Sequence, residues 1–189
     1  MKVIDLITDP QPELWDNAII YIKTINDRLK DNYLNINFNE FLSFPVVVKD
    51  EKIICFSGLQ YNEQRWGIRV GRFSSRMWIH PDYRIQSLSK FLGGEKFLNS
   101  IYCLPLQLEK AREARLDTIF ISREHNLVGF GQYLNLLKIN CGLDFEMKTN
   151  RYNVCGEDAV CAQYVAVHNL TDMGEEIWIK NMTKYLIIE

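Results

Sequence analysis

The stretch Ser75-Arg-Met-Trp-Ile-His-Pro-Asp-Tyr-Arg-Ile-Gln-Ser-Leu-Ser-Lys-Phe-Leu92 decides the fold of this chain. Its first part, Met77 to Ile79, is an apolar run that predicts a strand. Pro81 ends this strand, because proline has no N–H to donate to a neighbouring strand. Apolar residues then recur at helical spacing up to Leu92, so a helix is expected to begin near Gln86 or Ser87.

This predicted turn has the features of an anion-binding site. Unpaired N–H groups and the positive end of the helix dipole meet at the start of a helix, where they favour a negatively charged group. Arg84 adds a full positive charge to the same turn. The other interpretation is an ordinary corner between a strand and a helix, with Arg84 in solvent.

The stretch resembles the cofactor-binding motif of the GNAT superfamily of N-acetyltransferases. In that motif a strand ending in Val-x-Pro-x-Tyr-Arg is followed by Arg/Gln-x-x-Gly-x-Gly/Ala. Residues 79–84 match the first half, and residues 84–89 occupy the second half. The match departs at Ser87 and Ser89, which stand where the family has glycine. Glycine lets a phosphate approach the main chain closely, whereas serine adds a hydroxyl donor.

The resemblance implies a co-substrate, acetyl-CoA, and the groups that bind it. The turn would hold the pyrophosphate, and the main chain of the preceding strand would bind the pantetheine arm in a gap between this strand and the next. The residues implied in binding are Met77, Trp78, Ile79, Arg84, Ile85, Gln86, Ser87, Leu88, Ser89 and Asn126.

A second match begins at Asn126. The family often has Asn, Ala three residues on and Tyr seven residues on, and here Gly129 and Tyr133 occupy the two later positions. The resemblance implies that Tyr133 protonates the leaving thiolate. The other interpretation of Tyr133 is a core tyrosine on an apolar helix face.

The general base is less defined. An amine must lose a proton to attack a thioester, and a carboxylate or imidazole near the reacting nitrogen can accept it. Glu124 and His125 follow the second central strand, and His80 ends the first. Glu124 is the base we select, while either histidine, or a water relay to a main-chain carbonyl, is an alternative.

The rest of the chain supplies the elements of the same fold. Strands are expected at Val3–Ile7, 46–48, 53–56, from Ile68 to the opening stretch, 117–122, 145–155 and 162–167. Helices are expected at 13–30, 105–116 and 127–137, with a helical turn at Phe41 and Leu42, a connector at 58–67 and an insertion at 93–105. We therefore predict an α/β (α+β) GNAT-like fold with a mixed, mostly antiparallel sheet of six or seven strands flanked by helices.

Composition limits the class of protein. The chain has 189 residues, is 47% hydrophobic and carries a formal net charge of −2, so it can bury a core and has no global attraction to nucleic acid. No apolar run is long enough to cross a membrane, and the residues after Met1 do not resemble a signal sequence. The five cysteines lack zinc-site spacing, so we expect free thiols, no metal and a cytoplasmic location.

These inferences combine into one expected activity. We predict a single acyltransferase domain at 1–170 and a C-terminal extension at 171–189. The enzyme would be an N-acetyltransferase that acts on a small-molecule or peptide amine. The apolar residues 186–188 of the extension predict a homodimer. Two alternatives stay open, namely a GNAT-like binding module that has lost coenzyme A, and a relative of the enzymes that make acyl-homoserine lactones.

Overall fold

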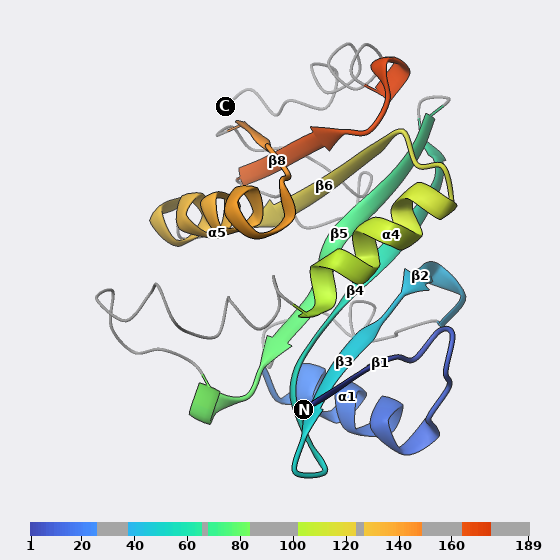
Figure 1. Ribbon diagram of the computed structural model, residues 1–189, viewed down its shortest axis with the longest axis vertical. Coiled ribbons are helices and arrows are strands. Elements are labelled where there is room, and N and C mark those ends of the chain that lie inside the picture. The colour runs from blue at the N-terminus through green and yellow to red at the C-terminus, as the bar shows by residue number, and fades with distance from the viewer. Residues whose placement is uncertain (26–37, 66–67, 84–101, 124–126, 149–163, 175–189) are drawn as a thin grey trace. The chain divides into compact units, whose positions relative to one another are not determined.

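A computed structural model describes residues 1–25, 38–65, 68–83, 102–123, 127–148 and 164–174. Their strands form one mixed sheet in the order β1-β3-β4-β5-β6-β8-β7, with the short β2 paired to β4 off this path (Figure 1). The strands are β1 (Lys2–Asp5), β2 (Phe41–Ser43), β3 (Pro45–Lys49), β4 (Lys52–Arg65), β5 (Ile68–Ile79), β6 (Thr118–Arg123), β7 (Glu146–Lys148) and β8 (Tyr164–Asn169). The helices are α1 (Pro12–Ile25), α4 (Leu104–Glu113) and α5 (Leu127–Cys141), with short 3-10 turns η1 (Phe38–Glu40) and η2 (Pro81–Tyr83).

The chain divides into two compact units. Unit 1 comprises Met1–Gln60 and Ser74–Lys110, and unit 2 comprises Tyr61–Phe73 and Ala111–Glu189. The long strands β4 and β5 contribute residues to both units.

Unit 1 is built on the predicted hairpin of β3 and β4. Two residues join the strands, Asp50 and Glu51, and both have positive φ, at 49° and 62°. A two-residue hairpin loop of this kind matches the right-handed twist of its strands, which explains why the link is so short. The register shifts between Val47 and Val48, so β4 carries a bulge at this point.

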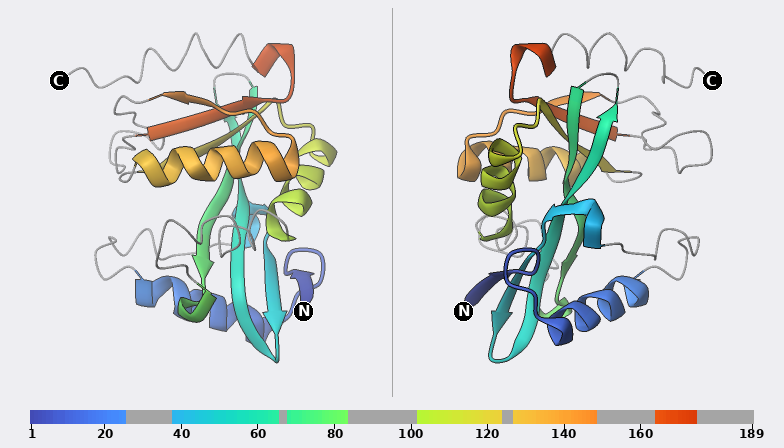
Figure 2. Two further views of the ribbon diagram at one scale, coloured as in Figure 1. Left: turned by 60° about the vertical axis from the view of Figure 1, so that its left-hand side comes forward. Right: turned by 90° about the vertical axis from the view of Figure 1, so that its right-hand side faces the viewer.

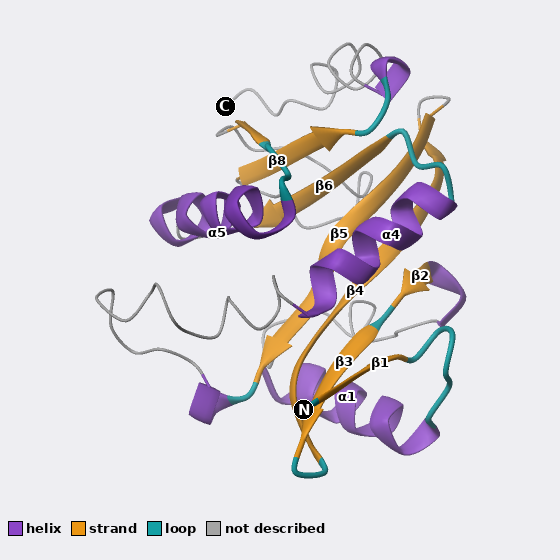
Figure 3. Ribbon diagram, viewed as in Figure 1, coloured by secondary structure: helices purple, strands orange, loops and turns teal. Residues whose placement is uncertain are grey.

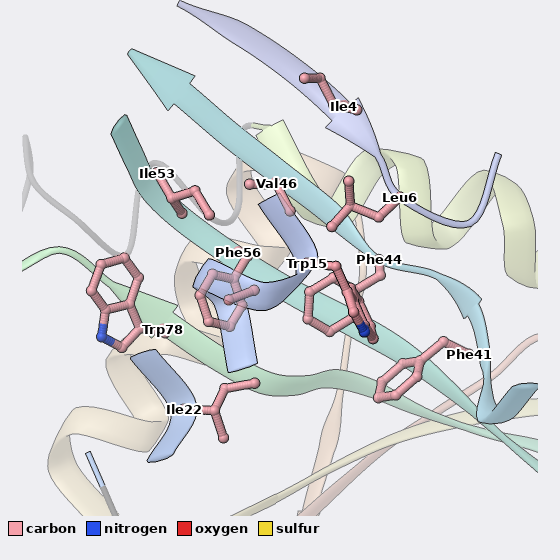
Figure 4. Packing of buried hydrophobic residues seen from close by; sticks show 11 residues of the cluster. Ile4, Leu6, Trp15, Ile22, Phe41, Phe44, Val46, Ile53, Phe56 and Trp78 are labelled. Atoms are coloured by element: carbon pink, nitrogen blue, oxygen red, sulfur yellow. The ribbon is translucent and has the colours of Figure 1, made fainter. Parts of the chain in front are cut away.

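Helix α1 covers one face of this part of the sheet (Figure 2). It presents Trp15, Ala18 and Ile22, all buried, at the spacing of three and four residues that a single helix face requires. The ring centroids of Trp15 and Phe44 lie 4.5 Å apart in an edge-on arrangement. Figure 4 shows both residues within the buried cluster. Burying a large apolar side chain stabilises a fold by about 1.5–3 kcal/mol, so this aromatic cluster is a main source of stability in unit 1.

The opposite face of unit 1 packs against the start of α4. Cys55 on β4 and Cys103 next to α4 are both fully buried in one cluster. A hydrogen bond with the Cys103 side chain, together with burial, raises the pKa of the Cys55 thiol well above its ordinary value. One turn further along α4, Gln107 Nε2 donates to the Ser57 hydroxyl at 2.7 Å and to its carbonyl at 3.0 Å.

Unit 2 is organised around β6. Strand β6 pairs in parallel with β5 over Val70–Arg72, as the expected crossover through α4 requires. On its other side β6 pairs antiparallel with β8, and β7 closes the edge. After the end of β8, Thr171 Oγ1 accepts the N–H of Gly174 at 3.1 Å, the contact by which a threonine caps the start of a helical turn.

Two local predictions were wrong. Residues 58–65 are not a connector, because β4 runs through them to Arg65 as a continuous strand (Figure 3). Phe41 and Leu42 are not a helical turn but part of β2, where Phe41 lies opposite Gln60. In both cases pairing with a distant strand overrides the local pattern.

The other described elements lie close to their predicted positions. The first strand, the first helix, the hairpin, the long strand ending at Ile79, the helix after Cys103 and the strand–helix pair from Thr118 are all present. Residues 93–101 of the predicted insertion and the loop 149–163 between the closing strands lie outside the described residues, while residues 102–105 lead into α4.

Candidate active site

The predicted site begins where β5 ends. His80 follows the last strand residue, and its N–H donates to the Ile54 carbonyl at 2.8 Å, so the ladder with β4 continues to this position. Pro81 then begins η2, and the N–H of Tyr83 donates back to the His80 carbonyl at 2.9 Å. The strand therefore ends in a closed turn whose last described residue directly precedes Arg84.

The side chain of His80 also belongs to this turn. Its Nδ1 accepts the N–H of Asp82 at 3.2 Å and lies 3.7 Å from the Asp82 carboxylate. The ring lies edge-on to Trp78, with centroids 5.8 Å apart, and to Tyr83, with centroids 5.9 Å apart. Lys49 Nζ lies over the Tyr83 ring, 5.5 Å from its centre, so a cation faces this ring of the turn.

Trp78 is a core residue on the α1 side of unit 1. It is 4% exposed, and it stacks between Tyr21 of α1 at 4.2 Å and Phe56 of β4 at 5.4 Å. These rings are nearly parallel, with interplanar angles of 7° and 19°. Sequence reasoning missed Tyr21 as a neighbour of the predicted cofactor strand, because nothing in the periodicity of α1 shows which strand its face contacts.

The main chain of β5 is irregular just before this point. Arg76 has φ of 55°, which is uncommon for a residue with a side chain and costs about 1 kcal/mol or more. After Arg76, the direction of each main-chain N–H can be counted back from His80, whose N–H donates to Ile54 of β4. Because successive residues of a strand direct their N–H and C=O groups to opposite edges, Met77 and Ile79 direct theirs to the edge away from β4.

Tyr133, the predicted acid, lies in unit 2. It is on α5 and only 1% exposed, among the largest fully buried side chains of the described residues. Its neighbours Leu134 and Leu137 are buried on the same helix, so the ring forms part of the core while its hydroxyl is the polar end.

The structure brings Met77, Trp78 and Ile79 together with His80 in unit 1, and it places Tyr133 in unit 2. Several predicted site residues lie outside the described residues, namely Arg84, Ile85, Gln86, Ser87, Leu88, Ser89, Glu124 and Asn126.

The described residues hold neither a metal site nor a membrane-spanning helix. Among the described residues, no group of three or more His, Cys, Asp or Glu side chains is arranged to hold a metal ion. None of the helices in the described ranges is both long and apolar enough to cross a membrane.

Comparison with known proteins identifies the fold. No family model and no curated protein sequence matches the chain. Solved structures do match. An acetyltransferase of the GNAT family from Staphylococcus aureus Mu50 has a TM-score of 0.55 at 12% identity, covering 90% of this chain and 99% of that chain. An acetyltransferase from Streptococcus agalactiae 2603 has a TM-score of 0.56 at 12% identity, covering 89% and 98%.

A third match is to the NatC complex bound to Gag peptide and CoA. Its TM-score is 0.51 at 17% identity, and it covers 90% of this chain and 100% of that chain. At these identities the likeness is one of architecture, and it extends over nearly the whole of each chain. The chain therefore has the fold of the GNAT acetyltransferases, the acyl-CoA N-acyltransferase fold.

Proposed function

We propose that this protein is an acyl-CoA-dependent N-acyltransferase that transfers an acetyl group from acetyl-CoA to an amine of a small molecule or peptide. One observation carries the proposal. Strand β5 ends at Ile79 and closes into the turn of Pro81–Tyr83 directly before Arg84, within a chain that has the GNAT fold.

We propose that the main chain of β5 binds the pantetheine arm of coenzyme A. That arm carries two amide groups, which need both donors and acceptors along an extended path. Following the motif that residues 79–84 resemble, our proposal assigns the arm to the main chain of Met77, Trp78 and Ile79, and the side chain of Trp78 has a packing role. Arg84 and the N–H groups of residues 85–89 would bind the pyrophosphate, with Ser87 and Ser89 adding hydroxyl donors. Asn126 would bind the same co-substrate from the start of α5.

The reaction follows from these roles. The lone pair of the acceptor nitrogen attacks the thioester carbonyl carbon, the new C–N bond forms, and the C–S bond breaks. Glu124 accepts the proton that the amine loses, and Tyr133 donates its hydroxyl proton to the departing thiolate. The products are an N-acetyl amine and coenzyme A with a free thiol. The support for this role is the motif, because Tyr133 stands seven residues after Asn126, as the tyrosine of the resembling family does.

Further proposals concern the whole protein. We propose that residues 1–170 act as one acyltransferase domain in the cytoplasm, and that residues 171–189 extend it and join two copies through the apolar residues 186–188. Light scattering tests the dimer, because one chain has a mass of 22.2 kDa. A mass of one chain with the extension intact would contradict it.

The experiment for the activity is a thiol-release assay. The full chain is incubated with acetyl-CoA and panels of amino acids, polyamines and short peptides, and free coenzyme A is measured. We expect release above the hydrolysis rate with one class of amine, together with a mass gain of one acetyl group on that amine. No release with any panel, although acetyl-CoA binds, would contradict amine transfer. No binding at all would favour the binding module without coenzyme A.

A further inference from the structure

His80 occupies the position at which the strand becomes the turn, and its side chain makes the bond that shapes this turn. The Asp82 N–H donates to His80 Nδ1 at 3.2 Å across two residues. Asparagine and aspartate make the same contact with their side-chain oxygen when they stabilise a turn two residues on. In this chain an imidazole nitrogen replaces that oxygen.

The accepting role of Nδ1 fixes the protonation of the neutral ring. A nitrogen that accepts an N–H must carry a lone pair, so the proton of the neutral imidazole is on Nε2. The lone pair that a general base would offer is therefore already used within the turn. This geometry argues against His80 as the base and in favour of a structural use of its nitrogen.

Two other contacts compete with this explanation. The Asp82 carboxylate lies 3.7 Å from Nδ1, but its side chain is 83% exposed, and an ion pair at the surface contributes little because water screens it. The edge-on contacts with Trp78 and Tyr83 hold the ring in place. They depend on the ring and not on the nitrogen, so substitution can separate them from the hydrogen bond.

We propose that His80 is a positioning residue for acyl-CoA binding, which acts by accepting the Asp82 N–H at Nδ1 and thereby holding the turn that leads into Arg84. This inference rests on the proposed function. The reason is geometric: phosphate contacts are made by consecutive main-chain groups, and these point at one ligand only when the turn before them has a fixed conformation.

Two matched variants separate the nitrogen from the ring. His80→Asn keeps an acceptor two residues before the Asp82 N–H and removes the ring. His80→Phe keeps a ring between Trp78 and Tyr83 and removes the acceptor. By isothermal titration of the full chain with acetyl-CoA, we expect His80→Asn to bind within about twofold of the wild type. We expect His80→Phe to bind about three- to tenfold more weakly, the loss that one net hydrogen bond represents. Asp82→Asn keeps the main-chain N–H and should bind like the wild type.

The opposite ranking would overturn the proposal, because binding retained by His80→Phe and lost by His80→Asn would show that the ring matters and the nitrogen does not.

Amide hydrogen exchange at Asp82 separates this result from a failure of the proposed function. His80→Phe should exchange there about three- to tenfold faster than the wild type and His80→Asn. If exchange follows this order while all variants bind acetyl-CoA equally, the turn does not position the co-substrate. If the wild type does not bind acetyl-CoA, the proposed function fails, and the inference that rests on it fails too.

Discussion

Asp117 and Arg69 are joined by two hydrogen bonds that run in opposite directions. The Arg69 N–H donates to the Asp117 carboxylate at 2.9 Å, and the Asp117 N–H donates to the Arg69 carbonyl at 2.9 Å. The other carboxylate oxygen accepts the hydroxyl of Thr171 at 2.9 Å. Asp117, the residue directly before β6, thus bonds both to the start of β5 and to the segment after β8 within unit 2.

Replacing Asp117 with Ala should lower the free energy of unfolding by about 2–4 kcal/mol. The side chain is 8% exposed, so its loss leaves the Arg69 N–H and the Thr171 hydroxyl without this acceptor in a partly buried place. Urea unfolding measures the change. Asp16→Ala on the exposed side of α1 is the control and should change stability by less than about 0.5 kcal/mol. Equal stability of the two variants would contradict this role of Asp117.

Gly58 and Gly131 should respond in opposite ways to substitution by Ala. A Cβ on Gly58 would lie 2.5 Å from two ring atoms of Phe41 and 2.9 Å from Phe44, so we expect a loss of about 1–3 kcal/mol. A Cβ on Gly131 meets nothing within 4 Å, and alanine favours a helix interior, so we expect a gain of about 0.5–1 kcal/mol. Thermal unfolding compares them. A Gly58→Ala protein with the same unfolding temperature as the wild type would mean that Phe41 does not pack on β4 as described.

The Cys55 thiol should make stability fall in alkaline solution. The hydrogen bond with Cys103 and burial raise its pKa in the folded chain above the ordinary value of 9.0. The folded state therefore keeps a proton that the unfolded state loses, so stability declines as the pH rises above about 9, by up to about 1.4 kcal/mol per pH unit.

Urea unfolding of the wild type and of Cys55→Ala between pH 8 and pH 10 isolates this thiol. The difference between the two proteins should be constant below about pH 9 and should shrink above it. In the same range, native Cys55 should resist alkylation until the protein unfolds, because a buried neutral thiol is a poor nucleophile. Rapid alkylation of the native protein at Cys55 would exclude this account.

Tyr133→Phe tests the acid of the proposed reaction. The ring is kept and only the hydroxyl is removed, so we expect kcat to fall about 100-fold while the Kd for acetyl-CoA stays within about twofold. Tyr21→Phe preserves the stack on Trp78 and should leave kcat unchanged. A Tyr133→Phe enzyme with full kcat would remove this residue from the chemistry and return it to the core.

How far the sequence predicts the fold depends on how local the signal is. The end of β5 was predicted correctly because Pro81 is itself the cause. The hairpin of β3 and β4 was predicted for a similar reason, since its two strands are adjacent in the chain. The strand character of Phe41 was missed because it comes from a partner at Gln60, and that pairing leaves no local pattern.

The candidate site divides in the same way. The turn after Ile79 follows from the motif, whereas the use of His80 Nδ1 depends on a side-chain rotation that no motif encodes. The spacing of two residues between His80 and Asp82 is the only local signal of this contact, since asparagine at the first of these positions is a familiar turn former. The predictions for Ser87, Ser89, Glu124 and Asn126 stay predictions.

Binding of acetyl-CoA to the full chain tests the central claim most directly. By isothermal titration we predict a Kd in the micromolar range. Arg84→Glu should weaken binding at least tenfold, because it places a negative charge where the pyrophosphate would bind. Arg112→Glu, the same charge change on an exposed residue of α4, should bind like the wild type. No heat of binding and no thermal stabilisation at millimolar acetyl-CoA would contradict the assignment of this protein as an acyl-CoA-dependent enzyme.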